Sequence, residues 1–171
     1  MNYPRAFCFL GLLSFSTATF AGQVHDVFKE GVFGLAWGAP VKEVQARFPN
    51  GVLKEYSGIQ YFETKEQKTL FQVQQRKKDK LIFSFDTEGR MAGMSAEFNP
   101  DDFAILQQKL LTEFPDAKPQ TTKVFGGFIY AWPDDNGIVL TVTHAGTTIS
   151  ISIGYSKLPS PSSTKEDLGF N

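Results

Sequence analysis

The residue types that could perform chemistry are few in this chain of 171 residues. It contains two histidines, His25 and His144, and one cysteine, Cys8. A Ser/His/Asp triad would need one of these histidines beside a sharply presented serine, and the sequence holds no Gly-x-Ser-x-Gly elbow. A zinc site calls for more imidazoles or thiolates than are present. We therefore expect no catalytic residue, no metal and no cofactor, with a hydrolase of unrecognised design as an alternative.

Three short polar patterns look functional but have simpler interpretations. Asp134-Asp135-Asn136-Gly137 offers calcium-type oxygens, yet no glutamate closes a twelve-residue loop, so a turn is expected. Ser162 and Lys165 have the Ser-x-x-Lys spacing, but they lie in a Pro/Ser-rich stretch without a helix to hold them together. The adjacent carboxylates at positions 101 and 102 suit the first turn of a helix.

The charge balance limits the classes of partner. The chain has 17 basic and 18 acidic residues, and this near-neutral balance disfavours nucleic acid and polybasic membrane binding. The segment Arg76-Lys77-Lys78-Asp79-Lys80 is a local concentration of positive charge. We interpret it as a charged hairpin tip, with an acidic partner surface as the alternative.

The first 21 residues have the pattern of a secretory signal. Arg5 supplies a positive charge, residues 6–15 are apolar, and small residues lead to a cleavage position after Ala21. This apolar run is too short for a bilayer, which needs about 20 residues, so no membrane anchor is expected. Cys8 would leave with the signal. The sequence thus predicts a thiol-free periplasmic or secreted protein.

Hydrophobic periodicity predicts the elements that follow. In the last expected strand, Ile149, Ile151 and Ile153 alternate with polar residues, as in an antiparallel sheet covered on one face only. Apolar residues spaced three and four apart, each run after a proline, predict two helices. The expected helices cover 40–48 and 100–114, and the expected strands cover 32–37, 52–56, 59–64, 69–75, 80–86, 90–98, 120–125, 128–132, 138–144 and 147–155.

An internal repeat is visible in these elements. Both helices begin at a proline (Pro40, Pro100) and both end in Phe-Pro, and glycine-containing hairpins follow each. This predicts an α+β fold of two tandem repeats, each of one helix plus a four-stranded antiparallel meander, with the helices packed on one face of the sheet. The repeats would cover about 32–98 and 99–155 within one domain of residues 22–157, before a disordered tail of residues 158–171. Chance recurrence of common turn residues is the alternative.

This tandem arrangement resembles the architecture of β-lactamase inhibitor proteins. The segment Phe33-Gly34-Leu35-Ala36-Trp37-Gly38, followed by Pro40 and Val44, is also similar to a helix start common in small exported bacterial domains. The chain departs from the inhibitors because they are stabilised by disulfides. The resemblance is to arrangement and one short motif, so it assigns no functional residue.

Aromatic side chains are the remaining candidates for a site. Tyr61, Phe62, Tyr130 and Trp132 lie on expected strands, and rigid rings on an open sheet face suit protein recognition. A core that is simply rich in phenylalanine is the alternative.

Two functions follow from these features. The first is an exported, non-enzymatic module that binds another protein, as an inhibitor or immunity-type partner of a secreted enzyme or as an envelope assembly factor. The second is a carrier or sensor of a small apolar ligand, with a cavity lined by residues such as Met91, Met94 and Phe103.

Overall fold

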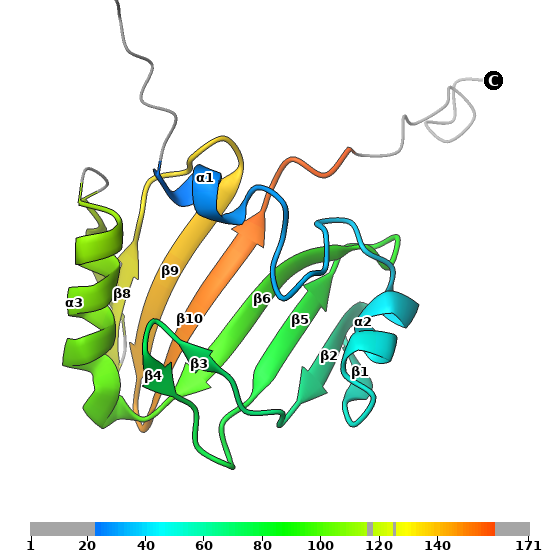
Figure 1. Ribbon diagram of the computed structural model, residues 1–171, viewed down its shortest axis with the longest axis horizontal. Coiled ribbons are helices and arrows are strands. Elements are labelled where there is room, and N and C mark those ends of the chain that lie inside the picture. The colour runs from blue at the N-terminus through cyan, green and yellow to red at the C-terminus, as the bar shows by residue number, and fades with distance from the viewer. Residues whose placement is uncertain (1–22, 116–117, 125, 160–171) are drawn as a thin grey trace, which may run out of the picture.

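The computed structural model describes residues 23–115, 118–124 and 126–159 (Figure 1). The expected signal peptide of residues 1–21 lies outside these ranges, as does the expected tail from residue 160 onward. Within the described ranges, no helix is long and apolar enough to span a bilayer.

Eight strands form one antiparallel sheet, in the order β1-β2-β5-β6-β10-β9-β8-β7. Strands β1, β2, β5 and β6 pair one after the other, and so do β7, β8, β9 and β10. The two groups are joined in the middle of the sheet, where β10 pairs with β6. The strands are β1 (Val52–Tyr56), β2 (Ile59–Thr64), β5 (Leu81–Phe85), β6 (Met91–Phe98), β7 (Gln120–Val124), β8 (Gly127–Ala131), β9 (Ile138–Ala145) and β10 (Thr148–Tyr155).

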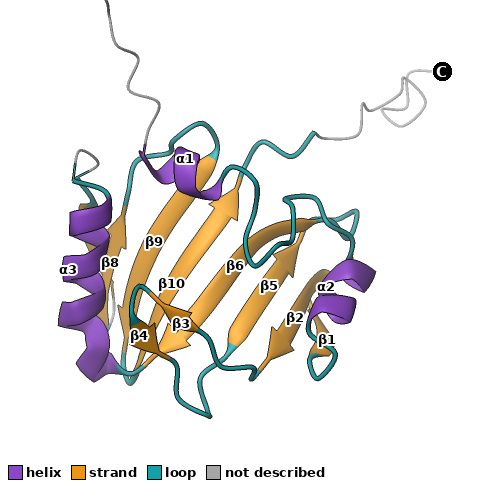
Figure 2. Cartoon of the chain, viewed as in Figure 1, coloured by secondary structure: helices purple, strands orange, loops and turns teal. Residues whose placement is uncertain are grey.

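The remaining elements lie against one face of this sheet (Figures 1 and 2). Helix α3 (Phe103–Glu113) lies over the β8 side, and α2 (Val41–Arg47) lies over the β1–β2 side. Between them are helix α1 (Gln23–Phe28) and a small hairpin of β3 (Thr69–Leu70) and β4 (Val73–Gln74), near opposite ends of the central strands. A 3-10 turn, η1 (Pro100–Asp102), leads into α3. We call this face the covered face and the other the open face.

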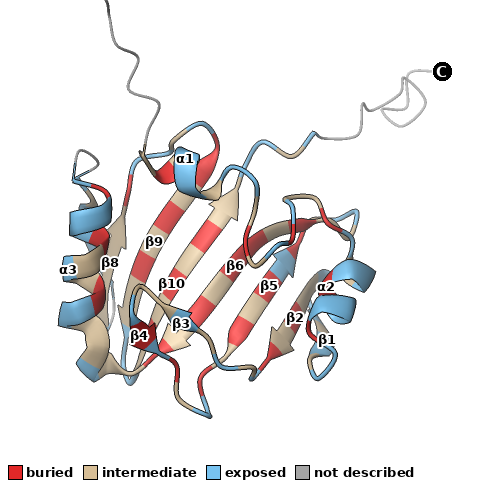
Figure 3. Cartoon of the chain, viewed as in Figure 1, coloured by how far each residue is buried: buried red, intermediate tan, exposed pale blue. Residues whose placement is uncertain are grey.

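Strict alternation along the strands builds the core. In β10, Ile149, Ile151 and Ile153 are at most 2% exposed, whereas the residues between them are half-buried. Figure 3 shows buried positions alternating with half-buried ones along β9 and β10. Phe83 of β5 is fully buried, and its ring lies 5.0 Å from that of Phe48, which follows α2. Because successive side chains of a strand point to opposite faces, the core lies entirely on the covered face.

The expected pair of helix-plus-four-strand repeats is wrong. Strands β6 and β10 pair over six residues, from Phe98 with Ile149 to Gly93 with Gly154, so the strands form a single eight-stranded sheet. Helix α1 and the β3–β4 hairpin break the predicted correspondence between the two halves. Shared prolines and glycines mark local starts and turns, and they do not determine which distant strands pair.

Two expected strands are also wrong, and in both a tight turn replaces the strand. In the segment 32–37, Val32 and Leu35 exchange backbone hydrogen bonds of 3.0 and 2.9 Å around Phe33 and Gly34. The segment 69–75 folds back on itself at Phe71 and forms the β3–β4 hairpin. Alternating apolar residues fit a strand, but backbone with positive φ at these positions ends it.

The expected helix starts at the two prolines are confirmed. Pro40 has extended backbone immediately before α2, and Pro100 opens η1 before α3. Asn99 caps this second start, because its side chain accepts a hydrogen bond from the backbone N–H of Asp101.

The charged segment 76–80 forms a turn, but the expected hairpin tip is wrong, because the strands on either side, β4 and β5, belong to different sheets and do not pair. Asp79 is 4% exposed and accepts hydrogen bonds from the backbone and guanidinium of Arg76, with Nη2 at 2.7 Å from Oδ1. Burial raises the pKa of Asp79, but the bonds and charge of Arg76 outweigh it and hold this pKa below its usual value. The ion pair therefore fixes the turn that follows the hairpin.

Candidate functional site

The four aromatic residues expected to form a site do not share one surface. Phe62 on β2 and Trp132 after β8 are 1% and 3% exposed, so both belong to the core. Tyr130 on β8 is on the covered face, with its ring 5.8 Å from that of Phe103 in α3. Tyr61 is on the open face, opposite Ser84. Strands β5, β6, β10 and β9 separate Tyr61 and Phe62 of β2 from Tyr130 and Trp132 of the β8 region.

The two histidines are also far apart. His25 is in α1, and its backbone N–H donates to Asp135 Oδ2 at 2.8 Å, beside the start of β9. His144 is near the other end of β9, roughly 20 Å away at about 3.3 Å per residue, with its ring stacked on Phe128 at 5.0 Å. Each has a buried Nδ1 without a hydrogen-bond partner in the described part of the chain. Among the residues that the structure describes, no serine hydroxyl is hydrogen-bonded to either imidazole.

The acidic turn at Asp134 forms as expected. Its Oδ1 accepts from the backbone N–H of Gly137 at 2.8 Å, and its Oδ2 accepts from Ser156 Oγ at 3.4 Å. These oxygens are therefore used by the chain itself. Across the described ranges, no group of three or more potential metal ligands comes together.

The covered face carries a cavity of about 330 Å³, partly open to solvent, which we call the central cavity. Helices α2 and α3 cover the two sides of the sheet, and α1, the loop after it and the β3–β4 hairpin lie over the middle (Figure 2). The central cavity lies among these middle elements. The floor is the sheet itself, through Met94 of β6 and Ile151 and Ile153 of β10. The walls are formed by Val27, Phe28, Gly31, Val32 and Phe33 on one side and by Thr69, Leu70 and Phe71 of the hairpin on the other.

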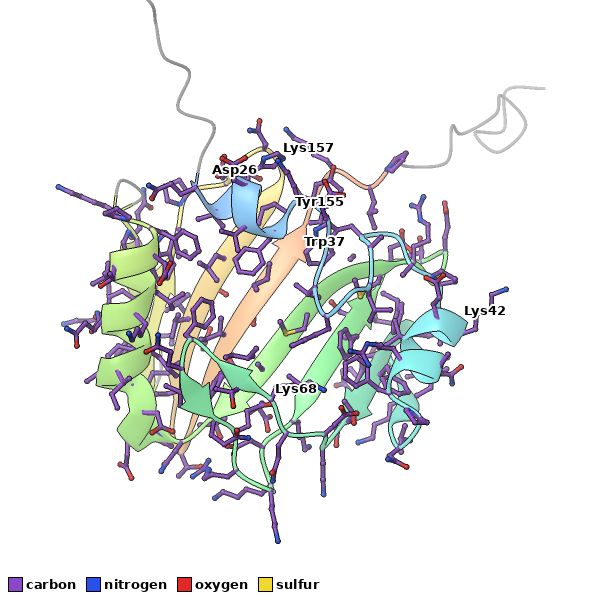
Figure 4. All side chains as sticks on the ribbon, in the orientation of Figure 1. Asp26, Trp37, Lys42, Lys68, Tyr155 and Lys157 are labelled. Carbon is purple, nitrogen blue, oxygen red and sulfur yellow. The ribbon has the colours of Figure 1, made fainter. Side chains whose placement is uncertain are left out.

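The wall that contains α1 is held in place by Trp37. Its indole Nε1–H donates to the carbonyl of Phe28 at 2.7 Å, which ties the end of α1 to the loop after it. The Trp37 ring stacks on Tyr155 at 6.0 Å, and Figure 4 shows the two side by side at the end of β10. The loop wall is thus fixed to the sheet independently of anything inside the cavity.

The hairpin wall is anchored at its base. Gln75 is 2% exposed, and its Nε2 donates to the carbonyls of Glu97 at 2.9 Å and Lys80 at 3.2 Å. Its backbone N–H donates to the carbonyl of Lys68 at 3.0 Å, which closes the base of the hairpin. The tip carries only the two residue pairs of β3 and β4. The hairpin is therefore firm at the base and weakly held at the tip.

The hairpin tip has an unusual backbone for its sequence. Phe71 and Gln72 have φ of 50° and 65°, in the left-handed region that bulky residues rarely adopt. Such two-residue turns strongly favour glycine at the second position. Three other turns in the described ranges have positive φ at both positions and follow this preference: Phe33-Gly34, Ser57-Gly58 and Asn136-Gly137. Backbone strain of this kind is concentrated at functional sites.

The lining of the central cavity determines what it can bind. None of its side chains is charged, and the only polar one, Thr69, uses its hydroxyl to bond Gln74 Oε1. A dry cavity of about 150 Å³ is enough for benzene, so this larger cavity has room for more than one small ring. The site suits an uncharged apolar molecule and offers no acid, base or nucleophile for a reaction.

The open face carries a second concavity of a different kind. This hollow of about 290 Å³ is lined partly by glycines and hydroxyls, among them Ser84, Gly93, Ser95, Ser152 and Gly154. Ser152 Oγ donates to Ser95 Oγ at 3.0 Å, so the hydroxyls at its centre satisfy each other. The hollow is shallow and mixed in polarity, and it holds neither a charged side chain nor an aromatic one.

Sequence reasoning identified one residue of the central cavity and missed most of the others. Met94 lines it as expected, but Met91 is fully buried in the core and Phe103 packs on Phe128 at 5.0 Å. The strongest missed signal is Phe-Gly at positions 33 and 34, because glycine after a bulky residue favours a tight turn. Phe71-Gln72 carries no such signal.

Comparisons with known proteins add no assignment. No protein-family model, no curated protein and no solved structure matches the chain. The comparisons leave the resemblance to the β-lactamase inhibitor architecture untested, and the tandem repeat on which that resemblance was based is contradicted by the single eight-stranded sheet.

Proposed function

We propose that this protein binds a small, uncharged apolar ligand in the central cavity, as a carrier or sensor exported by its N-terminal signal. The observation that supports the proposal best is the cavity itself, an apolar space of about 330 Å³ over the middle of the sheet. The space is partly open to solvent beside exposed Val27, so a ligand can enter it from outside. An apolar space of this size, with a strained turn beside it, suits a binding site better than a defect in packing.

The affinity would come from burial of the ligand. Each methylene transferred from water to such a lining contributes about 0.8 kcal/mol. Exposed Val27, at 61%, lies at the rim and gives the ligand an apolar approach from solvent. A charged ligand would lose its hydration here without gaining an ionic partner, so neutral molecules are favoured.

Filling the central cavity is expected to abolish binding of the fluorescent apolar probe N-phenyl-1-naphthylamine. In Leu70→Trp the added indole would occupy the space from the half-buried hairpin wall, and in Ile151→Phe the added ring would occupy it from the floor. We expect the probe's dissociation constant to rise at least tenfold in both variants, measured by fluorescence titration.

The matched control for this test is Thr141→Trp, which adds the same indole on the open face, in the hollow. It should bind the probe as the wild type does. If the wild type shows no saturable binding, or if all three variants bind it equally, the central cavity is not the ligand site.

A second candidate function, binding to another protein, is favoured by the β1–β2 edge of the sheet. On the open face of this hairpin, Val52, Tyr56 and Ile59 are 57%, 76% and 59% exposed, next to the expected site residue Tyr61. Exposed apolar residues on an edge strand are typical of association sites. We call this surface the edge patch.

A charged cluster borders the edge patch. Glu63 bonds Lys54 at 2.9 Å and Lys80 at 3.2 Å. Burial raises the pKa of Glu63, but the hydrogen bonds and charges of the two lysines outweigh it and leave this pKa below its usual value. A compact ion cluster beside exposed apolar side chains resembles the polar rim and apolar centre of a protein interface.

The double variant Tyr56→Lys/Ile59→Lys tests this second function. Captured from an extract of the source organism, a true partner should be retained at least tenfold less by the double variant than by the wild type, quantified by mass spectrometry. Val124→Lys, an apolar-to-lysine change on the opposite edge strand β7, should retain it fully. Equal retention by all three proteins would rule out the edge patch as the binding surface.

A further inference from the structure

A second space adjoins the central cavity on the side of α3. This side cavity of about 140 Å³ is lined by Gln72, Lys109, Glu113 and Phe114, together with Val27 and Phe71. Val27 and Phe71 also line the central cavity. Of these two shared residues, Val27 belongs to α1 and Phe71 to the hairpin tip, so the hairpin tip stands between the two spaces.

Phe71 is placed there at a cost. Left-handed backbone at a bulky residue is strained and persists only where the surroundings enforce it. The hairpin base is anchored by buried Gln75, whereas Gln72 at the tip is exposed. A strained, weakly paired tip on a firm base can move without unfolding the sheet, which is the property a gate needs.

We propose that Phe71 is a gate between the two cavities and that the ligand is an elongated, uncharged amphiphile. Its apolar chain lies in the central cavity, and its polar end lies in the side cavity once the Phe71 ring has swung aside. This inference rests on the ligand-binding function proposed above and adds the shape and chemical class of the ligand.

The polar end is assigned by the chemistry of the side cavity. Lys109 and Glu113 are one helical turn apart on α3, and within the described ranges neither forms a salt bridge. Together with the Gln72 amide they offer donors and acceptors but no net charge. A hydroxyl or an amide can donate and accept at once, whereas an anion or a cation would be repelled by one member of the pair.

Chain length is the variable that tests the gate. We would compete linear 1-alkanols, from hexanol to tetradecanol, against N-phenyl-1-naphthylamine on the wild type and on Phe71→Ala. Alcohols short enough for the central cavity should bind Phe71→Ala no more tightly than the wild type, because the substitution removes one apolar side chain from the wall of that cavity. For the longest alcohols, which need both cavities, Phe71→Ala should bind at least tenfold more tightly than the wild type, because no ring has to be displaced.

Two further variants guard against a purely structural effect. Phe71→Asn also removes the ring but tolerates left-handed backbone, so it should show the same gain if the hairpin turn is kept. Leu70→Ala truncates the neighbouring wall residue, which lines the central cavity alone, and should show no gain that depends on length. Circular dichroism would confirm that each variant is folded.

The possible failures are distinguishable. Absence of probe binding to the wild type would remove the proposed function and the gate with it. The gate alone would be overturned if the wild type binds the probe but both Phe71 variants change the affinity for alcohols of every chain length by the same factor. If alkanoic acids bind more tightly than alcohols of the same length, and Lys109→Gln removes the difference, the assignment of an uncharged polar end is wrong.

Discussion

Replacing Phe83 with alanine is expected to lower the free energy of unfolding by about 3–5 kcal/mol, the range for truncating a buried phenylalanine. Phe83 is fully buried in the middle of β5, and its ring lies within 6.5 Å of the rings of Phe33, Phe48 and Phe62. The surroundings of so many fixed rings cannot collapse into the space left. Urea denaturation followed by circular dichroism would measure the loss, which is a large part of the 5–15 kcal/mol typical of a domain.

The neighbouring residue provides the control. Ile82 is half-buried on the open face, opposite Glu63 and Ser95. Ile82→Ala should cost about 1 kcal/mol or less, because water replaces the lost methyl groups without leaving a cavity. Similar losses for the two variants would mean that both faces of the sheet are buried, and the one-sided core described above would be wrong.

This contrast was predictable from the sequence, because it depends only on alternation along a strand. Because Tyr61 and Phe62 are adjacent, the same rule places them on opposite faces, and Tyr61 is the one on the open face. Alternation cannot say which face a helix will cover. Tyr130 was expected on an open face, yet it packs beneath Phe103, because only tertiary packing brings α3 over β8.

Pairing between distant strands was beyond sequence reasoning. The predicted repeat came from local features such as the prolines before each helix, and these features recur wherever a helix starts or a chain turns. The pairing of β6 with β10 joins residues more than 50 positions apart, and no local sequence pattern in either strand indicates which strand it pairs with. For this reason the sequence predicted two helix-plus-four-strand repeats, whereas the structure has one eight-stranded sheet together with α1 and the β3–β4 hairpin.

The central cavity was missed for a related reason. Leu70, Phe71 and Val73 look like part of a strand, and the sequence carries no glycine to suggest the turn that Phe71 and Gln72 make. Local preference and tertiary structure disagree at this point. Such disagreements are most often found at functional or strained sites, which is why the hairpin tip is central to the ligand proposal.

Replacing Ser152 with proline is expected to cost about 4 kcal/mol or more and to prevent cooperative folding under mild denaturant. Ser152 is in β10, with Ser95 of β6 on one side and Thr141 of β9 on the other. A proline in a strand that is paired on both sides removes a ladder hydrogen bond, and its ring clashes with the neighbouring strand. The size of the loss reports whether β10 is in the interior of the sheet.

The same substitution in an edge strand is the comparison that makes this test specific. Thr122 is in β7, which pairs only with β8, so Thr122→Pro leaves six of the seven strand pairs untouched and should cost at most about half as much. Thermal unfolding and hydrogen exchange of both variants would show the difference. If Ser152→Pro is tolerated as well as Thr122→Pro, β10 is itself an edge, and two separate four-stranded sheets would replace the single eight-stranded one. The floor of the central cavity would then be divided as well, since Met94 belongs to β6 and Ile151 to β10.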